Sequence, residues 1–191
     1  MNRKSLAMIL VLLVLLGTSP LTEGKPGGKY NQSAGCTCHS QSGTPAATVT
    51  LTGQPGQYTA GASSTLTVTV SNGISGTSGG FSLEVDKGSL STGTGLGVQV
   101  NSAQNSATHT SSGNTQRSWT VDWTAPSTGS GDVTLSVAGL TGNSNNGSSG
   151  DRWDTASYQI SEAGAAPNTA PSVSSMMLGP TGATTTSSPT L

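Results

Sequence analysis

Apolar and polar residues alternate strictly in several short runs between positions 47 and 160, and this alternation constrains the fold more than any other feature. Residues 65–71 read Thr-Leu-Thr-Val-Thr-Val-Ser, and residues 118–124 read Ser-Trp-Thr-Val-Asp-Trp-Thr. Successive side chains of a β-strand point to opposite faces, so each run predicts a strand with one apolar and one polar face. Similar runs lie at 48–52, 81–86, 133–137 and 158–160.

Residues that favour turns separate these runs, and no segment carries the apolar stripe of a long helix. Glycine, proline and asparagine cluster at 53–56, 72–73, 76–80, 126–131 and 143–150, which is typical of tight turns and loops. Strands of this kind pair into antiparallel sheets that turn their apolar faces inward. The pattern therefore predicts an all-β fold, an immunoglobulin-like antiparallel β-sandwich of about seven to eight strands.

Two tryptophans are the largest candidates for the core. Trp119 and Trp123 are four residues apart, so they share one face of their strand. Burial of such large rings dominates the energetics of a core, and we expect both to pack inside the sandwich. The alternative is a role in stacking against a sugar.

The charge of the chain excludes one class of partner. Its 191 residues include 7 basic and 8 acidic side chains, and the formal net charge is −1. A protein that binds nucleic acid needs a basic face, which this composition does not offer. We also expect a field too weak to recruit partners by net charge.

The first residues predict export from the cytoplasm. Arg3 and Lys4 precede an unbroken apolar run from Leu6 to Leu16. A positive start before an apolar run of this length is typical of a secretory signal peptide, and the run is short for a membrane span. We predict a signal peptide over residues 1–24 and a secreted or cell-surface mature chain without a membrane span. The alternative is an uncleaved membrane anchor.

Composition divides the remaining chain into three parts. Residues 25–46 are Gly-rich and polar, and we expect an extended N-terminal segment that lies on the domain. Residues 47–162 hold the alternating runs and form the predicted sandwich. Residues 163–191 carry no charge and consist largely of Ala, Pro, Ser, Thr and Gly, which is typical of a linker. Within them, 171–178 is similar to the first strand of a further repeat, so this part is either a disordered tail or the start of a truncated repeat.

Several short motifs occur along the chain in a recognisable order. They are Gly24-Lys-Pro-Gly27, the cysteine-containing segment 36–39, and the stretches 57–61, 79–85, 108–110, 119–126, 131–135 and 150–151. Together they resemble the Reeler (reelin-type) domain and its microbial relatives, the choice-of-anchor V domains, over residues 24–160. The resemblance implies an extracellular, non-catalytic module for adhesion or binding, which is appended to varied anchors or other domains.

Cys36, Cys38 and His39 form the cluster with the most obvious chemistry. Cys-x-x-Cys-His is the attachment motif for c-type haem, and the microbial relatives commonly carry it, but the spacer here is one residue shorter. Four states are open: a strained Cys36–Cys38 disulfide, haem c with His39 on the iron, a soft metal held by both thiolates and His39, or free thiols. The widely spaced disulfides of animal Reeler domains cannot form here.

The second histidine, His109, lies in a polar run before the tryptophan strand. We expect a hydrogen-bonded histidine at the surface or at a sheet edge. The resembled family also has a histidine here, which implies a structural or ligand role without saying which.

Asp151 and Asp154 are candidate calcium ligands, because Ca²⁺ prefers oxygen donors from loops. Asn143, Asn145 and Asn146 precede them in the sequence. The loop lacks the regularly spaced acids of a calcium-binding loop, so ordinary polar loop residues are the alternative.

Motifs for catalysis are absent from the sequence, which has no Gly-x-Ser-x-Gly elbow, zinc-protease motif or phosphate loop. We predict a secreted or cell-surface module for binding or adhesion, without enzymatic activity, within a larger surface protein. Its expected partner is an unknown protein or glycan at the cell surface. Its Thr/Ser faces and its Gly/Asn loops at the sandwich ends are the expected docking places. The alternative is a small extracytoplasmic electron-transfer protein that binds haem or a metal through Cys36, Cys38 and His39; no other cofactor is expected.

Overall fold

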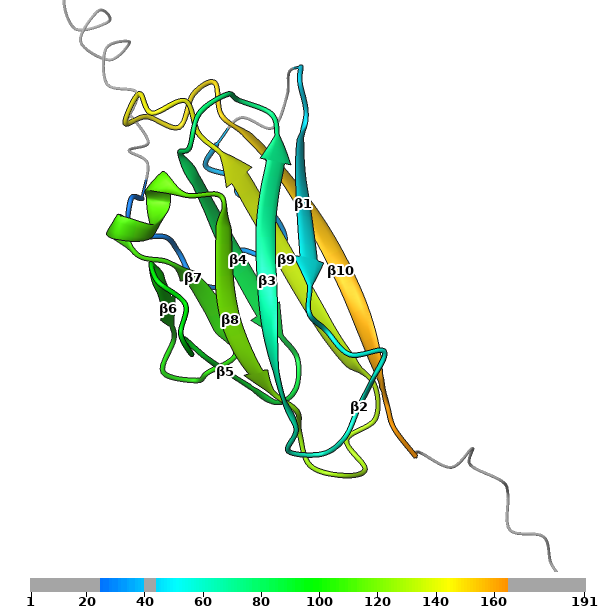
Figure 1. Ribbon diagram of the computed structural model, residues 1–191. Coiled ribbons are helices and arrows are strands. Elements are labelled where there is room, and N and C mark those ends of the chain that lie inside the picture. The colour runs from blue at the N-terminus through cyan, green and yellow to red at the C-terminus, as the bar shows by residue number, and fades with distance from the viewer. Residues whose placement is uncertain (1–24, 40–43, 165–191) are drawn as a thin grey trace, which may run out of the picture.

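The computed structural model describes residues 25–39 and 44–164, which form two β-sheets packed face to face (Figure 1). The four-stranded sheet has the order β1 (Ala47–Thr52), β3 (Ser63–Asn72), β8 (Ser118–Thr124) and β5 (Ser89–Ser91). The six-stranded sheet has the order β2 (Gln57–Tyr58), β10 (Arg152–Glu162), β9 (Val133–Thr141), β4 (Gly79–Val85), β7 (Ser106–His109) and β6 (Val98–Val100). A 3₁₀ turn, η1 (Ser111–Thr115), links β7 to β8.

The predicted all-β sandwich is confirmed, but the described residues hold ten strands rather than seven to eight. The additional strands are short: β2 has two residues, and β5 and β6 have three each. Runs of this length are too brief to show a two-residue period. The pairing is antiparallel except between β2 and β10, which run parallel. The predicted signal peptide and nearly all of the predicted tail lie outside the described residues.

The alternating runs place their apolar residues between the two sheets, as predicted. Trp119 and Trp123 are 1% and 0% exposed, so their assignment to the core is confirmed and the sugar-stacking alternative is wrong. Each indole N–H also has a partner, since Trp119 donates to the Gly113 carbonyl at 2.9 Å and Trp123 to the Lys87 carbonyl at 3.2 Å. The rings therefore fill the core without leaving a buried donor unpaired.

Side chains of β10 close the gap between the two sheets at one edge. The N–H of Val49 donates to Asp154 Oδ2 at 3.1 Å, and the N–H of Leu51 donates to the Tyr158 hydroxyl at 3.0 Å. Both donors belong to β1, the edge strand of the opposite sheet. An edge strand otherwise presents unpaired backbone groups to solvent or to other chains. Asp154 and Tyr158 accept two of these backbone N–H groups and so link the two sheets.

Residues 25–39, called the covering segment below, lie on the outer face of the six-stranded sheet. The N–H of Asn31 donates to Ser106 Oγ at 3.0 Å, that of Gln32 to Ser82 Oγ at 3.1 Å, and that of Ser33 to Glu84 Oε1 at 2.8 Å. Ser82 and Ser106 are only 2% and 0% exposed. Part of the polar face that the alternation directs toward water is therefore buried under this segment.

Trp153 extends the same contact from β10. Its indole N–H donates to the His39 carbonyl at 3.1 Å. A Cβ on Gly35, where φ is 140°, would come within 2.5 Å of the Trp153 ring, so this close approach requires glycine.

Within the described part of the chain, no helix has the length and apolarity needed to cross a bilayer.

We expect Tyr158→Phe to lower the free energy of unfolding by about 1–2 kcal/mol, because the N–H of Leu51 loses its acceptor. The measurement is urea unfolding followed by tryptophan fluorescence. Tyr30→Phe is the matched control, since it makes the same chemical change at a hydroxyl for which the described residues provide no hydrogen bond. Equal stability of the two variants would contradict the proposed role of Tyr158.

Candidate functional site

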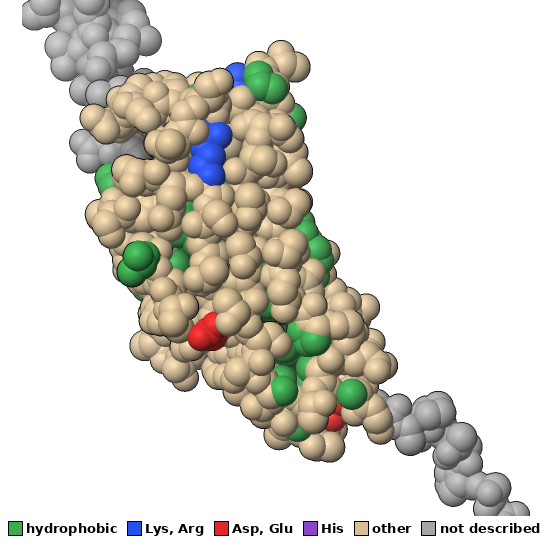
Figure 2. Space-filling model, in the orientation of Figure 1, with side chains coloured by type: hydrophobic (Ala, Val, Ile, Leu, Met, Phe, Trp, Pro, Cys, Tyr) green, Lys and Arg blue, Asp and Glu red, His purple; other side chains and the backbone are tan. Residues whose placement is uncertain are grey.

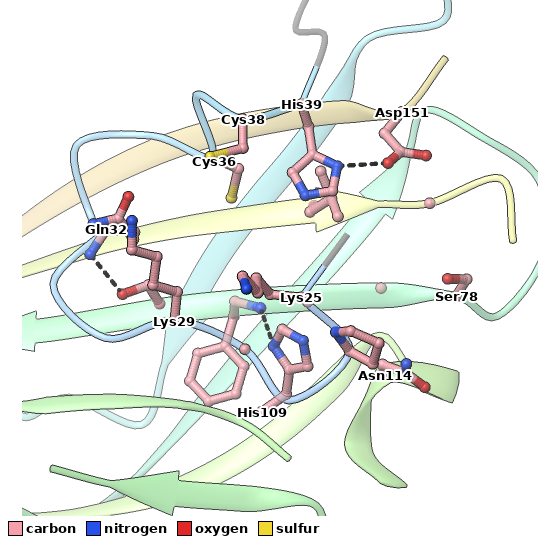
Figure 3. Close-up of a pocket in the computed structure, with 18 of the residues that line it drawn as sticks. Lys25, Lys29, Gln32, Cys36, Cys38, His39, Ser78, His109, Asn114 and Asp151 are labelled. Atoms are coloured by element: carbon pink, nitrogen blue, oxygen red, sulfur yellow. Dashed lines mark hydrogen bonds and ion pairs between the residues drawn. The ribbon is translucent and has the colours of Figure 1, made fainter. Parts of the chain in front are cut away.

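A cavity of about 410 Å³ opens at one end of the sandwich (Figure 3). Its walls come from three parts of the chain: the covering segment, the start of β4 with the end of β7 beside it, and the loop between β9 and β10. Gly79, Gly80, Phe81 and Leu140 belong to the sheet wall, and residues 144–147 to the loop. The site therefore exists only when segments distant in sequence come together.

Both histidines and both cysteines of the protein line this cavity. Cys36, Cys38 and His39 can be grouped from the sequence alone, because they are near neighbours. His109 cannot be added to that group from the sequence, since the covering segment must first dock beside the end of β7. Figure 3 shows His39 and His109 in different parts of the cavity wall, with Lys25 between them in the view.

His39 is held by a buried carboxylate. Its Nδ1 lies 2.6 Å from Asp151 Oδ2, and Asp151 is 3% exposed. The other carboxylate oxygen of Asp151 accepts the N–H of Asn143 at 2.9 Å. Asp151 thus fixes the His39 ring and anchors the β9–β10 loop beside it. The second nitrogen of the His39 ring, Nε2, does not bind Asp151.

His109 is buried at the end of β7 rather than at the surface or on an edge strand, so that part of the prediction is wrong. It is 9% exposed, and β7 lies between β4 and β6. The β4–β7 ladder ends at Ser82 and Thr108, and side chains take over from there. The N–H of Phe81 donates to His109 Nδ1 at 3.2 Å, and Thr108 Oγ1 donates to the Phe81 carbonyl at 2.6 Å. Burial lowers the pKa of His109.

The two cysteines are free thiols in the structure and differ in environment. Cys38 is exposed, whereas burial and, to a smaller extent, the neighbouring Cys38 raise the pKa of Cys36 to about 12. Cys36 therefore stays protonated near neutral pH, and a protonated thiol is a poor nucleophile and metal ligand. Among the residues that the structure describes, no three His, Cys, Asp or Glu side chains group as a metal site. The disulfide, haem and soft-metal states remain predictions.

The two candidate calcium ligands, Asp151 and Asp154, are not brought together around one point. Asp151 binds His39 and the loop on the outer side of the six-stranded sheet, while Asp154 accepts the N–H of Val49 from the opposite sheet. Each carboxylate has a structural partner of its own. Calcium binding by this pair remains a prediction, and this arrangement does not favour it.

Neutral and cationic groups that the sequence did not single out complete the cavity wall. They are two lysines and three asparagines, namely Lys25, Lys29, Asn114, Asn145 and Asn146. The position of both lysines just before the cysteine cluster was the only sequence signal for them. A cavity with an apolar wall and a few converging polar groups is typical of a ligand site.

The chain was compared with known families and structures. No family model matches the sequence, and no curated protein matches it. The solved Reelin-N domain of F-spondin is 18% identical with a TM-score of 0.44, and the match covers 71% of this chain and 92% of that one. A reeler domain of human F-spondin gives 16% identity and a TM-score of 0.46, with 72% and 96% covered. The bacterial hydrophobin BslA gives 12% and 0.34, with 61% and 98% covered.

We expect the protein to lose stability as the pH falls from 7 to about 5, because of His109. Its pKa in the folded state lies below the unfolded value of about 6.5. Below that pH the unfolded chain binds a proton that the folded chain does not, so unfolding becomes more favourable.

The measurement is the free energy of unfolding at several pH values for the wild type and for His109→Asn. Asparagine keeps an acceptor near the N–H of Phe81 but does not titrate, so the variant should show a flatter dependence. An unchanged slope in the variant would contradict the assignment.

Proposed function

We propose that the protein is an exported, non-catalytic binding module and that its ligand occupies the cavity beneath the covering segment. The observation that carries this proposal is the convergence of three distant segments on one cavity of about 410 Å³. Cavities of roughly 300–1,000 Å³ are usual for small-molecule sites. The predicted signal peptide and the resemblance to Reeler domains support export and a binding role.

The wall of this cavity is held in place before any ligand arrives. Backbone N–H groups of the covering segment bind Ser82, Ser106 and Glu84, and its end is fixed by Trp153 and Asp151. A site that is already ordered loses less conformational freedom when it binds. This favours recognition of a defined ligand.

The polar groups around the cavity are poorly arranged for catalysis. The Thr108 hydroxyl lies 3.5 Å from His109 Nδ1, but it donates to the Phe81 carbonyl instead. Cys36 stays protonated because burial raises its pKa. Nucleophilic catalysis needs a nucleophile activated by a base in contact with it, and neither group meets that condition.

The test of this proposal is binding of the exported protein to arrays of glycans and cell-surface proteins. Thr37 lines the cavity and is exposed, so Thr37→Trp should fill the opening and weaken binding by about tenfold or more. Thr50→Trp is the matched control, because Thr50 is exposed on the four-stranded sheet. Equal binding by both variants would show that the ligand binds elsewhere, and the absence of any bound partner would contradict the module.

A second candidate is an electron-transfer protein that holds haem or a soft metal at Cys36, Cys38 and His39. The observation in its favour is that His109 joins these three residues around one cavity. The hydrogen bond from His39 to Asp151 also resembles the carboxylate support that metal-binding histidines commonly have. The high pKa of Cys36 and the shortened spacer oppose it.

The visible spectrum and thiol reactivity of the purified exported protein separate these states. As a binding module with free thiols, it should be colourless, and iodoacetamide should modify Cys38 but not Cys36 until the protein is unfolded. A Soret band that persists after denaturation would favour covalent haem instead. Resistance of both cysteines to iodoacetamide until a reductant is added would indicate the disulfide.

A further inference from the structure

We infer that the cavity selects a carboxylate carried on a hydroxyl-rich ring, as in a uronic acid residue of an acidic glycan. This inference rests on the proposed function, because it names the ligand class of the same cavity. It depends on how the few charges of the protein are distributed and on which of them are already engaged.

Basic side chains gather at the cavity end of the sandwich. Lys25 and Lys29 line the cavity, Arg117 donates to the carbonyl of Ser78 in its wall, and Arg152 donates to the Gly150 carbonyl in the adjoining loop. On the face shown in Figure 2, blue side chains lie in the upper part and red ones in the lower part. The small net charge of the chain therefore hides a separation of charge along its length.

Acidic side chains gather at the other end. The Glu162 carboxylate accepts the N–H groups of Gly129 and Gly131. Lys87 also lies at this end, where its ammonium donates to the carbonyls of Ser130 and Asp132. Asp86 also lies there and accepts the N–H of Thr134. An anion approaching the molecule is thus repelled from this end and attracted to the cavity.

The charges inside the cavity do not cancel. Asp151 is the acidic residue in its wall, and its two oxygens already accept His39 and the N–H of Asn143. Within the described chain, the ammonium groups of Lys25 and Lys29 have no hydrogen-bond or ion-pair partner. A ligand carboxylate would supply one, through charge-assisted hydrogen bonds. If the signal peptide is cleaved after Gly24, the α-ammonium of Lys25 adds a further cation.

The other polar groups favour a hydroxyl-rich ligand over an acidic peptide. Asn114, Asn146, Ser78 and Ser144 are among the residues that line the cavity. Amide and hydroxyl side chains can donate to and accept from sugar hydroxyls. A peptide is commonly bound by pairing with a free strand edge. The strand at this wall, β4, pairs with β9 on one side. On the other side, beyond the end of the β4–β7 ladder, the N–H and the carbonyl of Phe81 are already bound by the side chains of His109 and Thr108.

The experiment is isothermal titration of the exported protein with trigalacturonate and with its fully methyl-esterified form. The ester keeps the ring and hydroxyls but removes the charge, so we expect binding to be about tenfold weaker for the ester. The double variant Lys25→Gln/Lys29→Gln should lose about tenfold in affinity for the acid, because two exposed charge contacts are modest individually. Lys87→Gln makes the same chemical change once at the opposite end of the sandwich and should bind like the wild type. Affinity for the acid should also fall in about 1 M salt, where the Debye length is about 3 Å.

The outcomes distinguish this inference from the proposed function. Equal affinity for acid and ester, with both abolished by Thr37→Trp, would overturn the selection of a carboxylate but leave the cavity as the binding site. Equal loss in the lysine double variant and in Lys87→Gln would also overturn it. Binding of hexaglutamate as tight as that of trigalacturonate would overturn the sugar as ligand class, and so would binding of neither.

Discussion

The hydrogen bonds between the covering segment and the outer face of the six-stranded sheet are the constraint on which the candidate site depends. In most sandwiches the outward side chains of a strand face water. Here Ser82, Ser106 and Glu84 instead accept backbone N–H groups of residues 31–33. A segment without strand pairing must find partners for its backbone donors when it is buried. Strands β4 and β7 provide these partners, and this places the cysteine-containing turn beside His109.

Electrostatics in this protein are decided by position rather than by net charge. A formal charge of −1 spread over 191 residues gives no reason to expect an anionic partner. Several acids are nevertheless already engaged. Glu162 and Asp86 accept backbone N–H groups at the end far from the cavity, whereas Asp151 binds His39 and Asp154 binds the edge strand β1. The lysines of the covering segment remain without such partners. Docking of that segment therefore brings cations to the cavity that the sheet itself does not contain.

The two-residue period of the sequence predicts which face of a single long strand is buried. It does not predict how a separate segment packs on that strand. The runs at 65–71 and 118–124 are long enough to show a period of two, so their pairing faces and the burial of both tryptophans could be anticipated. Strands of two or three residues, such as β2 and β5, have no readable period. The period also cannot reveal whether a polar face meets water or another backbone, so the burial of Ser82 and Ser106 could not be foreseen.

The candidate site shows the same limit. Cys36, Cys38 and His39 could be grouped because they are adjacent, but the environment of Cys36 depends on burial that its neighbours in sequence do not reveal. His109 was expected near the surface because its neighbours are threonines. It is buried because the β4–β7 ladder ends one residue earlier and its ring replaces a backbone acceptor for Phe81.

Two residues that line the cavity also stabilise the fold at this end. His109 binds the backbone of β4 and Asp151 holds the β9–β10 loop, and both line the cavity. A change to either residue therefore alters the stability of the fold and the shape of the cavity together. Lys25, Lys29 and Thr37 line it without holding the fold, because none has a side-chain hydrogen bond within the described residues. Substitutions at these three positions can therefore change recognition while leaving the sandwich intact.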